Sequence, residues 1–128
     1  MRLLLDTHAF LWWLAGDRKL TASARRAIHD ESSAVFVSAA SVWEIATKYR
    51  LGRLPGAAPI VGDLAATIAS QQFKPLAITL AHAQRAGALQ IQHRDPFDRM
   101  LIAQSHLEDL HLVSSEKLFD RFGVQRLW

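Results

Sequence analysis

Acidic side chains follow the apolar segments that this sequence offers as strands. Asp6 comes directly after three leucines, Glu44 comes shortly after a Val-Phe-Val run, and Glu116 follows a Leu-Val pair. Asp95 and Asp98 open an apolar helical segment. Ligands bind along the carboxyl ends of the strands in an open α/β sheet, so these distant acids are expected to meet in space. Several carboxylates repel one another unless a cation lies between them, and hard oxygen ligands select Mg²⁺ or Mn²⁺.

Each of these acids also has a purely structural interpretation, because helix starts favour carboxylates. Ser41 and Glu44 have the spacing of a capping box, and Glu44 and Lys48 have that of an i,i+4 ion pair worth only about 0.2–0.5 kcal/mol. Asp95 before Pro96 is a strong helix-start signal. Taken singly, each acid is more often structural than catalytic. An acid at every such position, where Ser or Asn would cap equally well, favours a cation site.

Strand and helix signals alternate along the chain. Strands are expected at residues 2–5, 34–37, 73–78, 111–113 and 123–127. Helices are expected at residues 8–14, 22–29, 42–50, 60–70, 80–86, 95–108 and 116–122. The alternation predicts βαβ units, and therefore a three-layer α/β/α sandwich with a mostly parallel central sheet. Pro75 restricts the third strand to an edge, and Gly87 is expected to stop the fifth helix.

The composition indicates one soluble globular domain over residues 1–128. Half of the residues are hydrophobic, which is enough for a sizeable core, and the formal charge of +3 permits a nucleic-acid partner without requiring one. The absence of cysteine excludes disulfides, zinc–thiolate sites and cysteine nucleophiles, and it fits a cytoplasmic protein. No apolar run approaches the roughly 18 residues that span a bilayer, so neither a membrane partner nor a signal peptide is expected.

Three long segments carry a more specific signal than any single acid. They are residues 4–14 (LLDTHAFLWWL), 37–45 (VSAASVWEI) and 93–104 (HRDPFDRMLIAQ). In this order they resemble the PIN-domain family, and more narrowly they are similar to VapC-type toxins of type II toxin–antitoxin systems; the likeness extends to Trp128. The resemblance implies a three-layer α/β/α fold, Mg²⁺- or Mn²⁺-dependent endoribonuclease activity on RNA, and inhibition by a cognate VapB-type antitoxin.

The resemblance also implies roles for the acids. The family's acids correspond to Asp6, Glu44 and Asp98, which are expected to be catalytic and to bind the metal. Asp6 and Asp98 are expected to bind the ion directly, with Glu44 completing its coordination or orienting a water molecule for attack on the phosphodiester. Asp95 belongs to the Asp-Pro-x-Asp helix start. It is expected either to be a further catalytic acid or to support the residues that bind the metal. The chain departs from the family at Glu116, where an Asp is usual, so a water-mediated contact is expected there.

The polar and basic neighbours of the acids are candidates for substrate contacts. Arg94 and Arg99 are expected to hold phosphates, with a solvated helix end or an antitoxin contact as alternatives of at least equal weight. Thr7 is expected to hydrogen-bond an acid or to cap the first helix. His8 and His93 lie near the acids and either touch substrate or pack, whereas the other four of the six histidines are expected at the surface.

The chain has four tryptophans, and two of them lie in the apolar segment 10–14 (FLWWL). Aromatic side chains usually belong to a core, but this segment cannot bury every side in one small domain. A surface for an antitoxin helix or for a second copy of the chain is the alternative, and a homodimer is expected.

Two other functions stay open. A Mg²⁺-binding, receiver-like signalling module also gathers acids at strand ends, and Lys117 would be its C-terminal lysine. Receivers, however, place adjacent acids after the first strand, and Glu44 lies instead in a helical segment. The other alternative is a non-catalytic, RNA-binding PIN domain, which the intact acids argue against.

Overall fold

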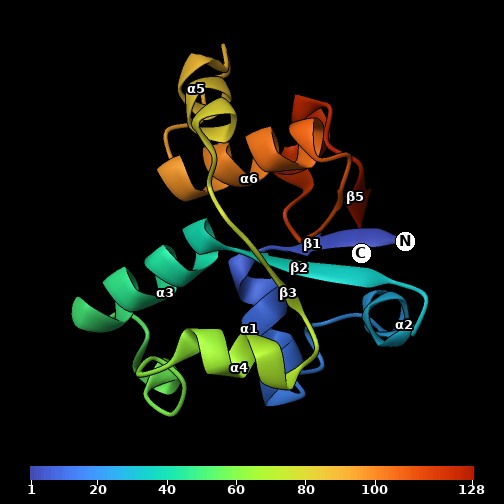
Figure 1. Ribbon diagram of the computed structural model, residues 1–128, viewed down its shortest axis with the longest axis vertical. Coiled ribbons are helices and arrows are strands. Elements are labelled where there is room, and N and C mark those ends of the chain that lie inside the picture. Colours follow the sequence, from blue (N-terminus) through green and yellow to red (C-terminus); the bar gives the residue numbers. More distant parts are fainter.

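The computed structural model describes residues 1–128 and consists of a five-stranded sheet with helices on both sides (Figure 1). The strands are β1 (Arg2–Leu5), β2 (Ala34–Ser38), β3 (Lys74–Leu76), β4 (His111–Val113) and β5 (Arg126–Leu127). The helices are α1 (Thr7–Ala15), α2 (Ala22–His29), α3 (Ala39–Arg50), α4 (Leu64–Ser70), α5 (Leu80–Ala88) and α6 (Pro96–Leu107), with short 3₁₀ segments η1 (Pro55–Ala57) and η2 (Lys117–Phe122). The strand order is β3-β2-β1-β4-β5 and every pairing is parallel, which confirms the predicted α/β sandwich.

The central strand β1 explains the run of three leucines. Leu3, Leu4 and Leu5 are all fully buried. Leu3 and Leu5 belong to the apolar core on one face of the sheet, and Leu4 belongs to the core on the other face. A central parallel strand is covered on both faces, so it reads as a continuous apolar run rather than an alternating one. The carboxyl end of β1 lies in the middle of the sheet edge, which is where Asp6 follows.

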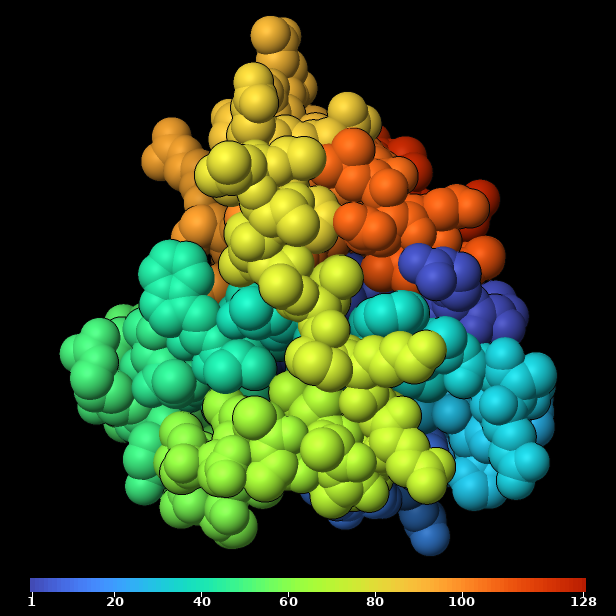
Figure 2. All heavy atoms as spheres, in the orientation of Figure 1, coloured from blue at the N-terminus to red at the C-terminus, as the bar shows by residue number.

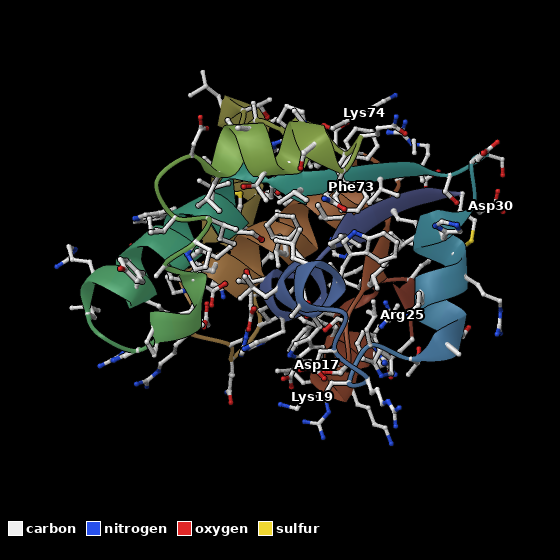
Figure 3. The ribbon with its side chains drawn as sticks, turned by 90° about the horizontal axis from the view of Figure 1, so that it is seen from below. Asp17, Lys19, Arg25, Asp30, Phe73 and Lys74 are labelled. Atoms are coloured by element: carbon white, nitrogen blue, oxygen red, sulfur yellow. The ribbon has the colours of Figure 1, made fainter.

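The larger of the two cores packs α1, α2 and α4 against one face of the sheet (Figure 3). Phe73, labelled in Figure 3, lies with its ring 6.4 Å from that of Phe10 and 5.9 Å from that of Trp13. The Trp13 indole nitrogen donates to the Gln71 side-chain oxygen at 2.9 Å. Contacts within this chain therefore bury Phe10 completely, whereas Leu11, Trp12, Trp13 and Leu14 pack against the core but remain half-buried.

The helices α5 and α6 lie together on the opposite side of the sheet, and α5 with the segment after it projects from the molecule (Figures 1 and 2). His82 of α5 is 1% exposed, so the prediction that it lies at the surface is wrong. Its Nδ1 accepts from the Thr79 backbone N–H at 3.1 Å, and its Nε2 lies 2.7 Å from Glu108 Oε1. Burial of this ring is tolerated because both nitrogens have partners.

The helix α3 begins three residues earlier than predicted. Ser38 caps it, with its hydroxyl accepting from the Ala40 backbone N–H at 3.0 Å. The predicted capping box between Ser41 and Glu44 is therefore wrong. The chain turns into the helix as soon as β2 ends, so the serine directly at that junction takes the cap and Ser41 becomes a fully buried residue inside the helix.

Other predicted boundaries also differ. The helix α4 begins at Leu64 behind an Asp63 cap rather than at residue 60, and α5 continues through Gly87, since glycine near a helix end costs only about 1 kcal/mol. The last strand has two residues and begins only after Gly123 has turned the chain with a φ of 69°. The edge position predicted for the strand containing Pro75 is confirmed. None of the helices has the length and apolar character needed to cross a membrane.

Candidate active site

Five acids from four parts of the chain line one pocket of about 240 Å³, which we call the carboxylate pocket. It lies where the starts of α1, α3 and α6 gather at one end of the sheet (Figure 1). Its lining consists of Asp6, Thr7, His8, Glu44, Lys48, Asp95, Asp98, Glu116 and Leu118. All five predicted site acids are thus neighbours, although Asp95 and Asp98 reach the pocket from a helix that follows α5 rather than a strand.

Asp6 joins β1 to α1. Its backbone N–H donates to the Val113 carbonyl at 3.1 Å, and its Oδ1 accepts from the Ala9 N–H at 2.7 Å as the cap of α1. The residue is 5% exposed, and this burial raises the pKa of its carboxyl from 3.8 to about 6. Hydrogen bonds from Ser114 and Ala9 act in the opposite direction, while the negative charge of Asp98 adds to the rise.

Asp98 lies in the first turn of α6, with its Oδ2 2.8 Å from His93 Nε2. Burial raises the pKa of this carboxyl, the hydrogen bond from His93 lowers it, and the charges of Asp95 and Glu44 raise it further. Asp95 caps α6, since its Oδ1 accepts from the backbone N–H groups of Phe97 at 2.9 Å and Asp98 at 3.1 Å. The predicted cap at Asp95 is confirmed, and the same residue still borders the pocket.

Glu44 is 5% exposed, and both of its carboxylate oxygens have protein partners. Its Oε1 accepts from the Thr7 hydroxyl at 2.5 Å, and its Oε2 is paired with the Lys48 ammonium group one helical turn along α3. The Thr7 hydroxyl also lies 3.1 Å from that of Ser41. The predicted i,i+4 pair and the predicted contact of Thr7 with an acid are both confirmed. Lys48 itself was not predicted as a site residue, although its spacing from Glu44 was the available signal.

The chemistry of this donor set suits a hard divalent cation. Asp6, Glu44 and Asp98 are oxygen donors from three different parts of the chain; the charge of Asp98 raises the pKa of Asp6, and the charge of Glu44 raises the pKa of Asp98. No three His, Asp or Glu side chains, however, already stand in an arrangement that would hold one ion. Each of the three carboxylates instead contacts another group of the protein: Asp6 the Ala9 amide, Glu44 the Lys48 ammonium group and Asp98 the His93 ring.

Arg99 has its donors committed to the chain itself. All three of its guanidinium nitrogens donate to backbone carbonyls, at distances of 2.6–3.3 Å. The acceptors are the carbonyls of Ala86, Gly87, Leu89, Ile91 and His93. Arg99 therefore fixes the segment between α5 and α6, and it holds no donor free for a substrate phosphate. Arg94 is exposed and does not line the carboxylate pocket.

The remaining predicted residues lie around the rim. His8 lines the pocket and stacks on Trp12 with ring centroids 5.5 Å apart. His93 contacts Asp98, as described above. Glu116 is exposed and also lines the pocket, and no ion pair joins it to another residue. The site thus has a buried floor of carboxylates and an exposed rim.

Several solved structures share this fold, although no curated protein sequence matches the chain. VapBC2 from Rickettsia felis, bound to a DNA fragment from their promoter, has a TM-score of 0.71 and 13% identity over 100% of this chain and 98% of that one. A toxin–antitoxin complex from Klebsiella pneumoniae has a TM-score of 0.69 and 17% identity over 98% of this chain and 96% of that one. VapC20 of Mycobacterium tuberculosis, a toxin that cleaves the sarcin–ricin loop, has a TM-score of 0.69 and 16% identity over 98% of each chain.

At such identities the likeness to these structures concerns the fold. The family comparison goes further, because residues 3–125 match the PIN domain family, which is nearly the whole chain. The protein belongs to the PIN-domain family.

Proposed function

We propose that this protein is a metal-dependent endoribonuclease and the toxin of a toxin–antitoxin pair. The observation that carries the proposal is the convergence of Asp6, Glu44, Asp98 and two further acids in one pocket at the edge of the sheet. Membership of the PIN-domain family supports the same conclusion, as do the toxins among the proteins of similar fold. The proteins of similar fold also include toxins bound to antitoxins, which supports a VapB-type antitoxin as the partner, and we further expect a homodimer.

Asp6, Asp98 and Glu44 are the residues that would hold the ion, Mg²⁺ or Mn²⁺. Such an ion supplies an activated water molecule and neutralises charge on the phosphodiester. The protein's own contribution is orientation. Asp95 fixes the first turn of α6, and Thr7 fixes the carboxylate of Glu44. Glu116, with its longer side chain at the rim, is assigned a water-mediated contact.

The substrate is proposed to be RNA, and cleavage provides the test. Wild-type protein is incubated with a panel of structured RNAs in Mg²⁺, in Mn²⁺ and in EDTA. Asp6→Asn and Asp98→Asn are expected to lose cleavage by about 10²-fold or more, because each removes a charged oxygen ligand. Asparagine still accepts the backbone hydrogen bond at residue 6, so the fold is retained. Asp30→Asn, at the exposed end of α2 (Figure 3), is the matched control.

Cleavage that persists in EDTA, or that both pocket variants retain in full, would end this assignment. Growth of bacteria tests the toxin part separately: expression of the wild type is expected to arrest growth, and expression of Asp98→Asn is not. A non-catalytic PIN domain would bind RNA equally in all variants and cleave it in none.

A further inference from the structure

We propose that Lys48 is a resident cation of the carboxylate pocket, which holds Glu44 until a divalent ion displaces it. Metal binding at this pocket is then an exchange of one cation for another, and Lys48 is a positioning residue that acts through Glu44. The inference rests on the proposed function, because it requires a divalent ion in this pocket. It adds a minimum concentration of divalent ion for binding, because the ion must compete with the Lys48 ammonium group for Glu44.

The geometry of the pair distinguishes it from an ordinary surface pair. The Glu44 side chain is 7% exposed and that of Lys48 is 35% exposed. A surface pair at i,i+4 spacing contributes little, but a carboxylate taken out of water needs a partner for its charge. Lys48, which lines the same pocket, provides that partner, and because its side chain is partly exposed its flexible stem can swing outward into solvent. The ammonium group thus balances the charge of Glu44 in the metal-free protein, and it can move into solvent when a divalent ion binds.

The three acids proposed to hold the ion differ in their partners. Glu44 alone is paired with a lysine or arginine, whereas Asp98 faces His93 and Asp6 accepts from the Ala9 amide. Neither aspartate therefore has a lysine or arginine as a partner, while Glu44 is held in a charge-balanced contact. Both oxygens of the Glu44 carboxylate are thus committed to the protein, one to Thr7 and one to Lys48.

The exchange has a measurable consequence for metal affinity. A site whose binding-competent state is only partly populated binds its ligand more weakly by that fraction. In the wild type the competent state is the one in which Lys48 has left Glu44. Removing the ammonium group makes that state permanent, and it also leaves the buried carboxylate of Glu44 without a counter-charge. At a pH high enough to keep this carboxylate ionised, both effects act in the same direction, toward tighter binding of the ion.

Isothermal titration of the full chain with Mn²⁺, without RNA, tests the exchange. Lys48→Met is expected to bind Mn²⁺ about tenfold more tightly than the wild type. Lys48→Arg keeps a cation at the same place and is expected to stay within about threefold of the wild type. Lys74→Met removes an equal charge from the edge strand β3 (Figure 3), and Lys74 does not line the carboxylate pocket, so this variant controls for net charge. Its affinity is expected to equal that of the wild type.

Equal or weaker Mn²⁺ binding by Lys48→Met would overturn the inference, as would an equal gain in Lys74→Met. Failure of the proposed function would give a different result. The wild type would then bind no Mn²⁺ in this pocket, and its titration would match that of Asp98→Asn. The two proposals therefore fail separately.

A measurement on the wild type alone keeps the test independent of how well the variants fold. Nitrogen-15 NMR of the lysine ammonium groups reports whether each is held or free. The Lys48 signal is expected to show a held ammonium group in EDTA and to move toward that of a solvated lysine as Mg²⁺ is added. A Lys48 signal that Mg²⁺ saturation leaves unchanged would contradict the exchange.

Discussion

The carboxylate of Asp6 accepts a hydrogen bond from the Ala9 amide in the first turn of α1 and also faces the other acids of the carboxylate pocket. Asp95 has the same double position at the start of α6. A helix start stabilises a carboxylate in its ionised form, which is the form that a metal ion needs. The structural and the catalytic interpretations of these acids are therefore compatible. A carboxylate has two oxygens, so one can cap the helix while the other faces the pocket.

Asp6→Asn is expected to stabilise the metal-free protein at neutral pH. Burial raises the pKa of Asp6 from 3.8 to about 6, so the folded state binds the proton more tightly than the unfolded state. The stability that this group contributes is present below its unfolded pKa and is lost as the pH rises through the folded value. The loss corresponds to about 3 kcal/mol. Thermal melts in EDTA from pH 4 to pH 7.5 are expected to show a difference between variant and wild type that grows with pH.

Asp30→Asn provides the contrast for these melts. Hydrogen bonds from Ser32 lower the pKa of the fully exposed Asp30, so its removal is not expected to stabilise the protein at any pH in this range. A melting temperature of Asp6→Asn below that of the wild type at pH 7.5 would contradict the assignment of burial as the dominant influence.

At the scale of elements, α6 organises two parts of the molecule at once. Its first turn carries Asp95 and Asp98 to the pocket, and Arg99, the next residue, reaches back to fix the irregular segment that follows α5. That segment carries His93, whose ring contacts Asp98. The pocket and the irregular segment are therefore coupled through one helical turn.

Arg99→Lys is expected to loosen the segment at residues 88–95 although it keeps the charge. Lysine has a single nitrogen and cannot span the carbonyls that the planar guanidinium joins. Loss of several charge-assisted hydrogen bonds is expected to cost about 2–4 kcal/mol of the free energy of unfolding. Hydrogen–deuterium exchange is expected to be faster at these residues than in the wild type. Arg94→Lys, on the same segment but exposed, is the control, and equal exchange in the two variants would refute the role of Arg99.

At the scale of the whole molecule, the carboxylate pocket exists only because the chain returns to one end of the sheet from several directions. Glu44 comes from one side of the sheet and Asp98 from the other, while Asp6 lies between them at the end of the central strand. An ion shared by these residues would join the two layers of helices at the end of the sheet. The pocket is thus a point at which a ligand can stabilise the entire fold.

Addition of Mn²⁺ is therefore expected to raise the melting temperature of the wild type, and removal of the ion with EDTA to lower it again. At a concentration about 100 times the dissociation constant, the gain is about 2.7 kcal/mol. Differential scanning calorimetry measures it, with Asp98→Asn as the variant expected to show little gain. An equal gain in wild type and variant would mean that the stabilising ion binds elsewhere.

Local sequence patterns were sufficient to predict the order and type of nearly all elements and the set of acids that line the carboxylate pocket. Alternation of apolar runs with helix-start signals such as Asp95-Pro96 is local information, and parallel strands must bring their carboxyl ends to a common edge. Helix boundaries were predicted less well. At the start of α3, for example, Ser38 and Ser41 are both suitable caps, and the structure uses Ser38.

The contacts that each side chain makes became apparent only in the folded molecule. A sequence shows that Arg99 stands beside an acid, but not that its donors turn toward five carbonyls of another segment. It shows His82 as one histidine among six, but not that partners from two helix ends allow it to be buried. It offers Lys48 as a surface pair, whereas burial of Glu44 makes that lysine part of the pocket. Partners of this kind depend on distances between segments far apart in the chain, and no local pattern encodes them.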